Sequence, residues 1–289
     1  MKFHKYHALG NDYLVLDPKN FDEVPSNEAI RRICHRNLGI GSDGILWGPF
    51  NQEKGKENFN LRIFNPDGSE AEKSGNGLRI FCRYLWDQQL VASNASFRVN
   101  TKGGLVEATV HPEGQEVTVS MGKVSFTSDL IPVQGELREV LQEKFQIEDQ
   151  VFEFCAATIG NPHCVVRTEK TSPEIAKKYG PMIENHPIFP NRTNVQFLKI
   201  LDRKNIKLEI WERGAGYTLA SGSSSSAAAA VARKLDWCDR ELTVHMPGGT
   251  LQIHVQADFQ IIMKGGVTKV CEGEADGEFF SYEFQEDGA

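Results

Sequence analysis

The sequence predicts a mixed fold of the α/β (α+β) class, built from two pseudo-symmetric halves that arose by internal duplication. Each half is expected to be a curved, mostly antiparallel sheet around one central helix, with the candidate site in the cleft between the halves. Three observations support this prediction. Short β-type runs outnumber helical patterns, several segments recur in order about half a chain length later, and 289 residues suffice for two domains of ordinary size.

Four segments of the first half recur in the same order in the second half. The matched pairs are Leu9–Tyr13 with Ile159–His163, Lys73–Gly77 with Ala220–Ser224, Gly103–Val110 with Gly248–Val255, and Val117–Gly122 with Gln260–Gly265. One Gly-Gly match would be chance, but four in order indicate a repeat far longer than solenoid periods of roughly 20–50 residues. We expect an N-terminal half over residues 1–122 and a C-terminal half over residues 123–267, with residues 268–289 returning to the first half.

Strands are expected where β-branched and aromatic residues form short runs bounded by Gly, Pro, Asn or Asp. In the first half these runs are Tyr13–Leu16, Leu61–Phe64, Phe97–Val99, Gly104–Val110 and Val117–Ser120. In the second half they are Val151–Ala157, Cys164–Arg167, Val195–Ile200, Lys207–Trp211, Leu242–His245 and Leu251–Val255. The two sets of runs are similar in residue type and in length, which agrees with a duplicated sheet.

Helical patterns are rarer and fall into two kinds. Asn27–Cys34 and Pro173–Tyr179 are amphipathic, and each lies near an Asn or Ser that can cap a helix. Gly77–Gln88 and Ser225–Leu235 are more apolar, so we expect one buried helix at the centre of each half. The serine-rich run Ser221–Ser226 resembles a flexible linker, but it leads into the second of these helices and is interpreted as a helix entry.

Composition and charge exclude several classes of partner. The net charge of −7 and the lack of a dense Lys/Arg run argue against nucleic acid. The N-terminus lacks the apolar core of a signal peptide, and no run is long enough to span a membrane. The six cysteines show no CxxC spacing, which favours free thiols in a reducing cytoplasm. Without a dinucleotide fingerprint, a P-loop or a metal-ligand cluster, we expect no cofactor and no metal.

Two matched Ser-Gly turns, at Ser74 and Ser221, mark the candidate site. Each follows a strand and a polar loop and opens a helix, whose unpaired N–H groups favour an anion. Glycines at 75, 77 and 222 allow a ligand to approach the backbone closely. Either turn alone is more often a simple helix cap, because serine is a preferred N-cap residue. Their recurrence at matched positions instead indicates two facing helix N-termini that hold one carboxylate from both sides.

The segments around these turns resemble the diaminopimelate epimerase family, the pyridoxal-phosphate-independent enzymes of lysine and peptidoglycan biosynthesis. The resemblance covers nearly the whole chain, and its specific segments are His4–Tyr13, Gly39–Gly44, Arg62–Gly77, Gly160–Cys164 and Trp211–Gly216. It implies two pseudo-symmetric halves with a small amino acid substrate in the cleft between them. The expected reaction interconverts LL- and meso-diaminopimelate by two-base proton transfer at the α-carbon.

In that family one cysteine thiolate removes the α-proton while a second cysteine, on the opposite face, delivers a proton. Those positions are Ser74 and Ser221 here, and the resemblance implies that His163 and Glu212 help to set the protonation of the pair. A thiol has an ordinary pKa of about 8.5, whereas a serine hydroxyl is far less acidic and needs a separate base. We therefore expect an enzyme that is inactive or much impaired with serine at both positions.

The resemblance also implies the residues that hold the substrate. Its distal amino-carboxylate end is expected at Asn65, Asn161, Asn194 and Arg213, with Asn11 completing the polar lining. Further substrate contacts are expected from Gly75, Asn76, Glu212, Gly222 and Ser223. The planar fork of an arginine suits both oxygens of a carboxylate, although a single loop asparagine often serves only its own turn. Gly44 stands where some members have a polar side chain, so no contact is expected from it.

Several alternatives stay open at this point. The two serines either replace cysteines in an engineered form or belong to a natural member with altered chemistry, and the retained pocket residues slightly favour the first. The chain could also be a racemase of another amino acid, or a non-catalytic protein that binds amino acids in the same cleft. The oligomeric state is open, with a homodimer as one alternative. The location expected from the sequence is cytoplasmic.

Overall fold

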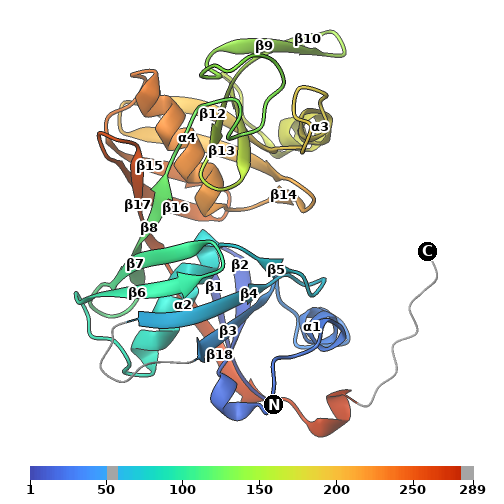
Figure 1. Ribbon diagram of the computed structural model, residues 1–289, viewed down its shortest axis with the longest axis vertical. Helices are drawn as coiled ribbons and strands as arrows, with labels where there is room; N and C mark the ends of the chain where they lie inside the picture. The colour runs from blue at the N-terminus through green and yellow to red at the C-terminus, as the bar shows by residue number, and fades with distance from the viewer. Residues whose placement is uncertain (51–57, 281–289) are drawn as a thin grey trace, which may run out of the picture.

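The computed structural model describes residues 1–50 and 58–280, which form two lobes stacked along the long axis of the molecule (Figure 1). The first lobe contains β1 (Lys2–Ala8), β2 (Asn11–Leu16), η1 (Pro18–Asn20), α1 (Asn27–Cys34), β3 (Ile45–Phe50), β4 (Asn58–Phe64), β5 (Glu70–Ala71), α2 (Gly75–Asp87), β6 (Ser96–Thr101), β7 (Gly104–Val110) and β8 (Glu116–Lys123). The second lobe contains β9 (Glu143–Ile147), β10 (Gln150–Thr158), β11 (Pro162–Arg167), α3 (Pro173–Glu184), β12 (Asn194–Asp202), β13 (Asn205–Glu212), β14 (Gly216–Thr218), α4 (Gly222–Lys234), β15 (Glu241–Met246), β16 (Gly249–Val255) and β17 (Gln260–Gly266). The chain then continues into β18 (Thr268–Glu274) and η2 (Gly277–Phe280).

The two lobes have the same strand pairing. In the first, β2 is antiparallel to β1 and parallel to β3, β4 is antiparallel to β3 and β5 and parallel to β6, and β7 is antiparallel to β6 and β8. In the second, β11, β13 and β16 repeat these relations with β10, β12, β14, β15 and β17. The helices α2 and α4 occupy equivalent places and both run for 13 residues. The mixed α+β class predicted from the sequence is confirmed.

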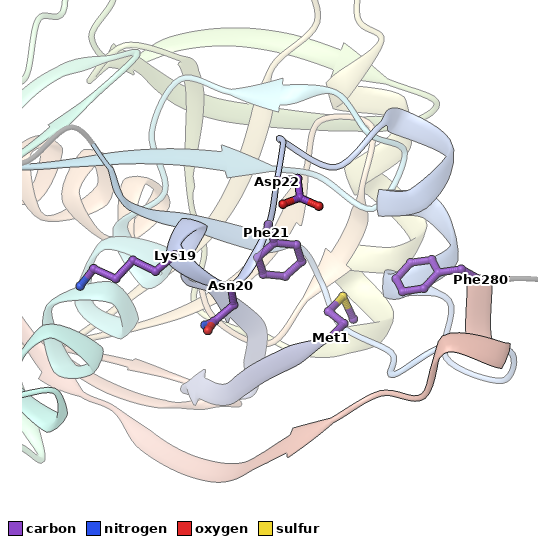
Figure 2. A pocket seen from close by; sticks show the side chains of 6 residues that line it. All are labelled: Met1, Lys19, Asn20, Phe21, Asp22 and Phe280. Carbon is purple, nitrogen blue, oxygen red and sulfur yellow. The ribbon is translucent and has the colours of Figure 1, made fainter.

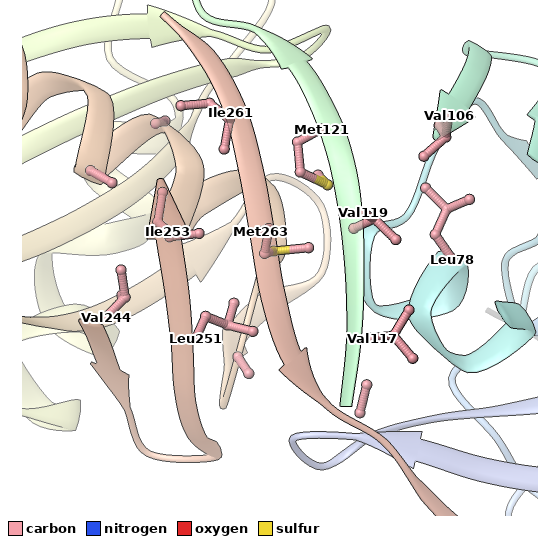
Figure 3. Close-up of a cluster of buried hydrophobic side chains, with 14 of the residues drawn as sticks. Leu78, Val106, Val117, Val119, Met121, Val244, Leu251, Ile253, Ile261 and Met263 are labelled. Carbon is pink, nitrogen blue, oxygen red and sulfur yellow. The ribbon is translucent and has the colours of Figure 1, made fainter. Parts of the chain in front are cut away.

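The lobes are joined by a strand pair that crosses from one to the other. Strand β8 is antiparallel to β17, from Glu116 opposite Gly266 to Lys123 opposite Gln260. Side chains from both lobes pack along this seam, where Val119 and Met121 of β8 lie beside Ile261 and Met263 of β17 (Figure 3). One apolar core therefore runs through both lobes, which limits their freedom to separate.

The C-terminal part of the chain returns to the first lobe. Strand β18 is antiparallel to β1, with Lys2 opposite Glu274 and His7 opposite Thr268. The equivalent flank of β10 is covered by β9, which is also antiparallel. Residues 281–289 of the predicted returning segment lie outside the described residues. The boundaries drawn at residues 122 and 267 stay predictions.

The central helices begin earlier than their apolar patterns suggest. We expected them from Gly77 and Ser225, but their first residues are Gly75 and Gly222, directly after the serine caps. In α4 the buried serines do not break the helix, because Ser225 Oγ donates to the Ser221 carbonyl at 2.8 Å and Ser226 Oγ to the Gly222 carbonyl at 2.7 Å. Small side chains fill this turn, so α4 packs closely against its sheet.

Other differences from the expected elements have tertiary causes. Helix α3 continues past Tyr179 to Glu184, where Gly180 packs against the Trp211 ring so closely that a Cβ would lie 2.5 Å from its Cγ. Strands β1 and β18 were not expected, because their lysines, histidines and glutamates hide any apolar alternation. Strand β1 also pairs with β2 and buries Tyr6 and Ala8 in the core, whereas β18 is mostly exposed and is held by its pairing with β1.

Two properties of the whole fold bear on location and redox state. All six cysteines are free thiols, and Cys271 alone among them is exposed. Across residues 1–50 and 58–280, the helices are too short or too polar to cross a membrane.

The close approach of α2 and α4 generates a stability prediction. A Cβ on Gly222 would lie 3.3 Å from Gly75 Cα and 3.1 Å from Met263 Cε, so the two helix ends would have to separate. We expect Gly222→Ala to lower the free energy of unfolding by about 1–3 kcal/mol, measured by urea denaturation. Gly277→Ala is the matched control, because a Cβ there meets nothing within 4 Å. Equal stability of the two variants would contradict this packing.

Candidate active site

The two matched serines cap two helices whose N-termini meet. Ser74 Oγ accepts a hydrogen bond from Gly77 N at 3.0 Å, and Ser221 Oγ accepts one from Ser224 N at 3.4 Å. Their backbone angles are nearly the same, with φ and ψ of −135° and 118° at Ser74 and of −145° and 126° at Ser221. The positive ends of two helix dipoles therefore converge, and such a place favours an anion.

Two methionines from the seam form the apolar floor beneath the helix ends. A Cβ on Gly75 would lie 3.0 Å from both Met121 Cε and Met263 Cε, and a Cβ on Gly222 would lie 3.2 Å from Met263 Sδ. Met263 thus touches the first residue of both helices. The lobes are therefore held together at the site itself. Larger residues at positions 75 or 222 would displace the two methionine side chains.

Asn76 links the two lobes through its side-chain amide. Its Nδ2 donates to Asn11 Oδ1 at 3.1 Å and to the Ala220 carbonyl at 3.4 Å, and its Oδ1 accepts from Arg79 Nη2 at 2.8 Å. Ala220 directly precedes Ser221, so this bond fixes the entry to α4 from the opposite lobe. Asn76 is only 5% exposed, which leaves its amide engaged with protein groups.

Arg79 places a buried positive charge behind the first turn of α2. It is fully buried, its Nη1 donates to the Gly75 carbonyl at 3.2 Å, and its Nε has no hydrogen-bond partner among the described residues. Burial lowers the pKa of the guanidinium to about 10, so it keeps its charge at neutral pH. Arg79 was not predicted from the sequence, although an arginine within the apolar run Leu78–Leu85 was a signal for it.

Asn11 is held from behind by a group of charged side chains. Its Nδ2 donates to Asp43 Oδ2 at 2.9 Å, and Arg36 Nη2 lies 2.7 Å from Asp43 Oδ1 and 2.8 Å from Asp12 Oδ1. Lys5 Nζ lies 3.0 Å from Asp12 Oδ2. Burial raises the pKa of Asp12, but its hydrogen bonds to Arg36 and Lys5 outweigh burial and lower it. These ion pairs fix the turn that carries Asn11.

The two serines have different polar neighbours. The Tyr13 hydroxyl donates to Ser74 Oγ at 3.3 Å, while Ser221 Oγ lies 3.5 Å from Ser223 Oγ. Burial raises the pKa of Tyr13 to about 12, and burial also raises the pKa of Glu212, a shift that the nearby Ser221 hydroxyl opposes. Glu212 was predicted at the site from the sequence but Tyr13 was not, because it stands inside a segment noted only for its Gly-Asn turn.

His163 is neutral and is held by amides rather than by the serines. Within the described part of the chain, its Nε2 bonds Asn161 Oδ1 at 2.9 Å and its Nδ1 accepts from Gln196 Nε2 at 3.1 Å. Gln196 Nε2 also donates to Ser224 Oγ at 3.0 Å, in the first turns of α4. Burial, reinforced by the charge of Arg213, lowers the pKa of His163 to about 3. Its influence on Ser221 is therefore indirect, through α4.

The loop after β13 carries Glu212 and Arg213 and is fixed by two buried residues. Asn194 Oδ1 accepts from Arg213 N at 3.0 Å, while Asn194 Nδ2 donates to the Pro162 carbonyl at 2.8 Å. Glu184 Oε1 accepts from Gly214 N at 2.9 Å, and Glu184 Oε2 accepts from Trp211 Nε1 at 2.7 Å. Glu184 was not predicted, because only the tertiary structure brings the end of α3 against this loop.

The remaining predicted residues are placed as follows. Arg213 is exposed, and its Nη1 donates to the Asn191 carbonyl at 3.0 Å. Ser223 is partly exposed, with its Oγ 3.5 Å from Ser221 Oγ. Asn65 Nδ2 donates to Ser69 Oγ at 3.0 Å, so this amide group serves its own turn. Gln196 connects His163 to the first turn of α4, while the side-chain hydrogen bond of Asn65 stays within its own turn.

A separate surface pocket of about 490 Å³ opens at the far end of the first lobe (Figure 2). It is lined by Met1, Lys19, Asn20, Phe21, Asp22 and Phe280. None of the residues predicted for the candidate site lines it. The predicted site and this pocket are therefore separate places on the molecule.

Comparisons with known proteins agree on one family. The profile of that family, described as diaminopimelate epimerase, matches residues 3–127 and 155–270. The protein named diaminopimelate epimerase 2 of Nostoc sp. is 59% identical over 283 residues, with 98% of each chain covered. The diaminopimelate epimerase of Stutzerimonas stutzeri is 38% identical over 275 residues, covering 95% of this chain and 98% of the relative.

Solved structures show the same fold at low sequence identity. A probable proline racemase from Agrobacterium radiobacter has a TM-score of 0.71 at 13% identity, with 96% of this chain and 93% of that chain covered. A hydroxyproline epimerase from Agrobacterium vitis has a TM-score of 0.68 at 14% identity, with 94% of this chain and 90% of that chain covered.

The neutral state of His163 predicts how stability depends on pH. Because its pKa falls from 6.5 to about 3 in the fold, the unfolded chain binds a proton below pH 6.5 that the folded chain does not. The free energy of unfolding should therefore decrease as pH falls from about 6.5 toward 3, by up to about 1.4 kcal/mol per pH unit from this group. Urea denaturation at several pH values should show a smaller slope for His163→Gln. The surface variant His254→Gln should keep the parental slope, and a parental slope in His163→Gln would contradict the assignment.

Proposed function

We propose that this chain, which belongs to the diaminopimelate epimerase family, binds diaminopimelate and transfers protons at its α-carbon, with serine at both reacting positions strongly limiting the rate. By its family the chain is a cofactor-independent isomerase. The observation that carries the proposal is the meeting of two serine-capped helix N-termini, where Gly222 and Gly75 are in contact.

The substrate α-carboxylate would lie at the joined helix ends. Backbone N–H groups there would donate hydrogen bonds to the carboxylate. They would also stabilise the further negative charge that develops when the α-carbon loses its proton. In this pose Ser74 approaches the α-carbon from one lobe and Ser221 from the other. Removal of the proton on one face and delivery on the opposite face inverts the centre.

The distal end of the substrate carries a second amino group and a second carboxylate. Arg213 is exposed at the loop after β13, so its guanidinium is available to a carboxylate from solvent. Asn161, whose Oδ1 accepts from His163, and Asn194, whose Oδ1 accepts from Arg213 N, lie on the same side of the lobe. We assign the distal amino-carboxylate to this group, with Asn11 contributing from the first lobe.

Serine at positions 74 and 221 is the reason that turnover should be slow. A thiol has an ordinary pKa of about 8.5 and gives a reactive thiolate at a helix N-terminus. A serine hydroxyl loses its proton only when a neighbouring base takes it in the same step. Binding depends on the helix ends and the amide groups, so it should persist where turnover is slow.

The first test of this proposal compares serine with cysteine at both positions. We expect the double variant Ser74→Cys, Ser221→Cys to epimerise diaminopimelate faster than the parent by a factor on the order of a hundred or more, because each thiol can act as acid or base near neutral pH. Exchange of the α-proton in deuterated water, followed by NMR, measures the rate directly. The single variants are controls and should stay slow. Equal rates in the parent and the double variant would show that thiols are not required.

The second test addresses the distal group. Arg213→Ala should weaken diaminopimelate binding roughly tenfold to a hundredfold, because a hydrogen bond to a charged group contributes about 1.5–3 kcal/mol. Calorimetry on the slow parent separates binding from turnover. Arg203→Ala is the matched control, since this surface arginine pairs with Asp236 and Asp239. Unchanged affinity in Arg213→Ala would refute the distal assignment and favour a smaller substrate.

A further inference from the structure

The two serines differ in the direction of their hydrogen bonds. A hydroxyl group has one hydrogen and two lone pairs. At Ser74 both lone pairs are engaged, since Oγ accepts from Gly77 N at 3.0 Å and from the Tyr13 hydroxyl at 3.3 Å. Ser74 can therefore donate its hydrogen to a ligand but has no free lone pair with which to accept a hydrogen bond.

Ser221 is held differently. Its Oγ accepts from Ser224 N at 3.4 Å, and among the described residues no second donor of fixed direction engages its other lone pair. A lone pair of Ser221 is therefore left for the ligand. Ser223 Oγ, 3.5 Å away and partly exposed, can donate or accept and so does not set this direction.

From this difference we propose that Tyr13 is a positioning residue for Ser74: it turns the Ser74 hydrogen toward the α-carbon and replaces the proton when Ser74 delivers one. The proposal rests on the proposed function and adds to it a positioning residue. Tyr13 acts through Ser74 and does not itself reach the substrate.

The packing around Tyr13 holds its hydroxyl in place. A Cβ on Gly44 would lie 2.7 Å from Tyr13 Cε1 and 2.5 Å from the Phe64 carbonyl, so the backbone at Gly44 lies directly against the ring. Tyr13 is 7% exposed and stands in β2 opposite Tyr6 of β1. The ring has no room to turn away from Ser74, which keeps the two hydroxyl groups together.

The charges around Tyr13 keep it protonated and therefore able to donate. Burial is the main reason that its pKa rises to about 12, and the negative charges of Glu212 and Asp43 act in the same direction. Cys34 also faces it and adds to the rise, whereas the bond to Ser74 opposes it. At neutral pH the group behind Ser74 is thus a protonated phenol.

The proposed transfer balances in protons and electrons. For the stereoisomer whose α-hydrogen faces Ser221, the C–H bond breaks, its proton moves to Ser221 Oγ, and the former hydroxyl proton of Ser221 moves to Glu212. The electron pair stays on the α-carbon and spreads into the α-carboxylate. Ser74 then gives its hydroxyl proton to the opposite face of the carbon and takes the phenolic proton of Tyr13. Solvent later returns a proton to Tyr13 and accepts one from Glu212. The other stereoisomer follows the same steps in reverse.

The first experiment separates exchange of the α-proton from inversion of the centre. Each stereoisomer of diaminopimelate is incubated with the parent or with Tyr13→Phe in deuterated water, and NMR and chiral analysis give both rates. Because a general acid typically contributes 10²–10⁴-fold, we expect the ratio of inversion to exchange to fall by about a hundredfold in Tyr13→Phe. Tyr6→Phe, which removes a buried hydroxyl bonded to Asp87, is the matched control and should keep the parental ratio. A parental ratio in Tyr13→Phe would overturn the proposal.

A second experiment needs no turnover. In Ser74→Cys, a hydrogen bond from Tyr13 should stabilise the thiolate, so the pH dependence of alkylation by iodoacetamide should lie about one unit lower than in Ser74→Cys, Tyr13→Phe. The parent supplies the background from its own cysteines. Coincident alkylation profiles would overturn the proposal. If no variant, with serine or with cysteine, exchanged the α-proton of diaminopimelate, the proposed function would fail, and the alkylation profiles would still decide whether Tyr13 donates to residue 74.

Discussion

The structure depends on one close contact, the approach of the first residue of α2 to the first residue of α4. Gly222 can lie against Gly75 because neither residue carries a side chain, and a single added Cβ would come within 3.3 Å of the opposite backbone. The seam of β8 and β17 brings the lobes together, and Met263 fills the space under both glycines. Two positive helix ends in contact are unfavourable by themselves, so an anion between them relieves this repulsion. The contact between the helix ends therefore favours a bound anion, such as the carboxylate of the proposed ligand.

The polar groups around this contact are arranged so that most buried charges have partners. Asp12 and Asp43 are paired with Lys5 and Arg36, and Glu184 accepts three hydrogen bonds through its two oxygens. Arg79 is the contrasting case, since it is fully buried and is held by a carbonyl and an amide rather than by a carboxylate. An arginine without a nearby acidic partner adds positive potential to the helix end in front of it. It therefore acts in the same direction as the helix dipoles.

The two lobes share a topology but differ in the groups that surround their serines. Topology repeats because each lobe must bury the same kind of central helix under the same kind of sheet. Tyr13 in β2 and Glu212 at the end of β13 are not equivalent in the repeat, since β2 corresponds to β11 and β13 corresponds to β4. A symmetric scaffold thus places different groups beside its two serines. Inversion of a chiral centre requires one face to accept a proton while the other gives one, which even two like residues can do in different protonation states.

The sequence by itself determined the class of fold, the repeat, and the two helix entries at Ser74 and Ser221, because caps, glycines and apolar runs act over short distances along the chain. It was less reliable for β1 and β18, whose charged residues hide the few buried apolar ones, and for α3, whose end is set by packing against Trp211. Arg79 left a signal as an arginine within an apolar run, but Tyr13, Gln196 and Glu184 could not be recognised as site residues, since their contacts are with residues distant in sequence. Only the tertiary structure decided that Tyr13 meets Ser74 and that Asn65 serves its own turn. The physical reason is that hydrogen-bond direction and burial depend on groups far apart in sequence, which become neighbours only when the two lobes close on one core.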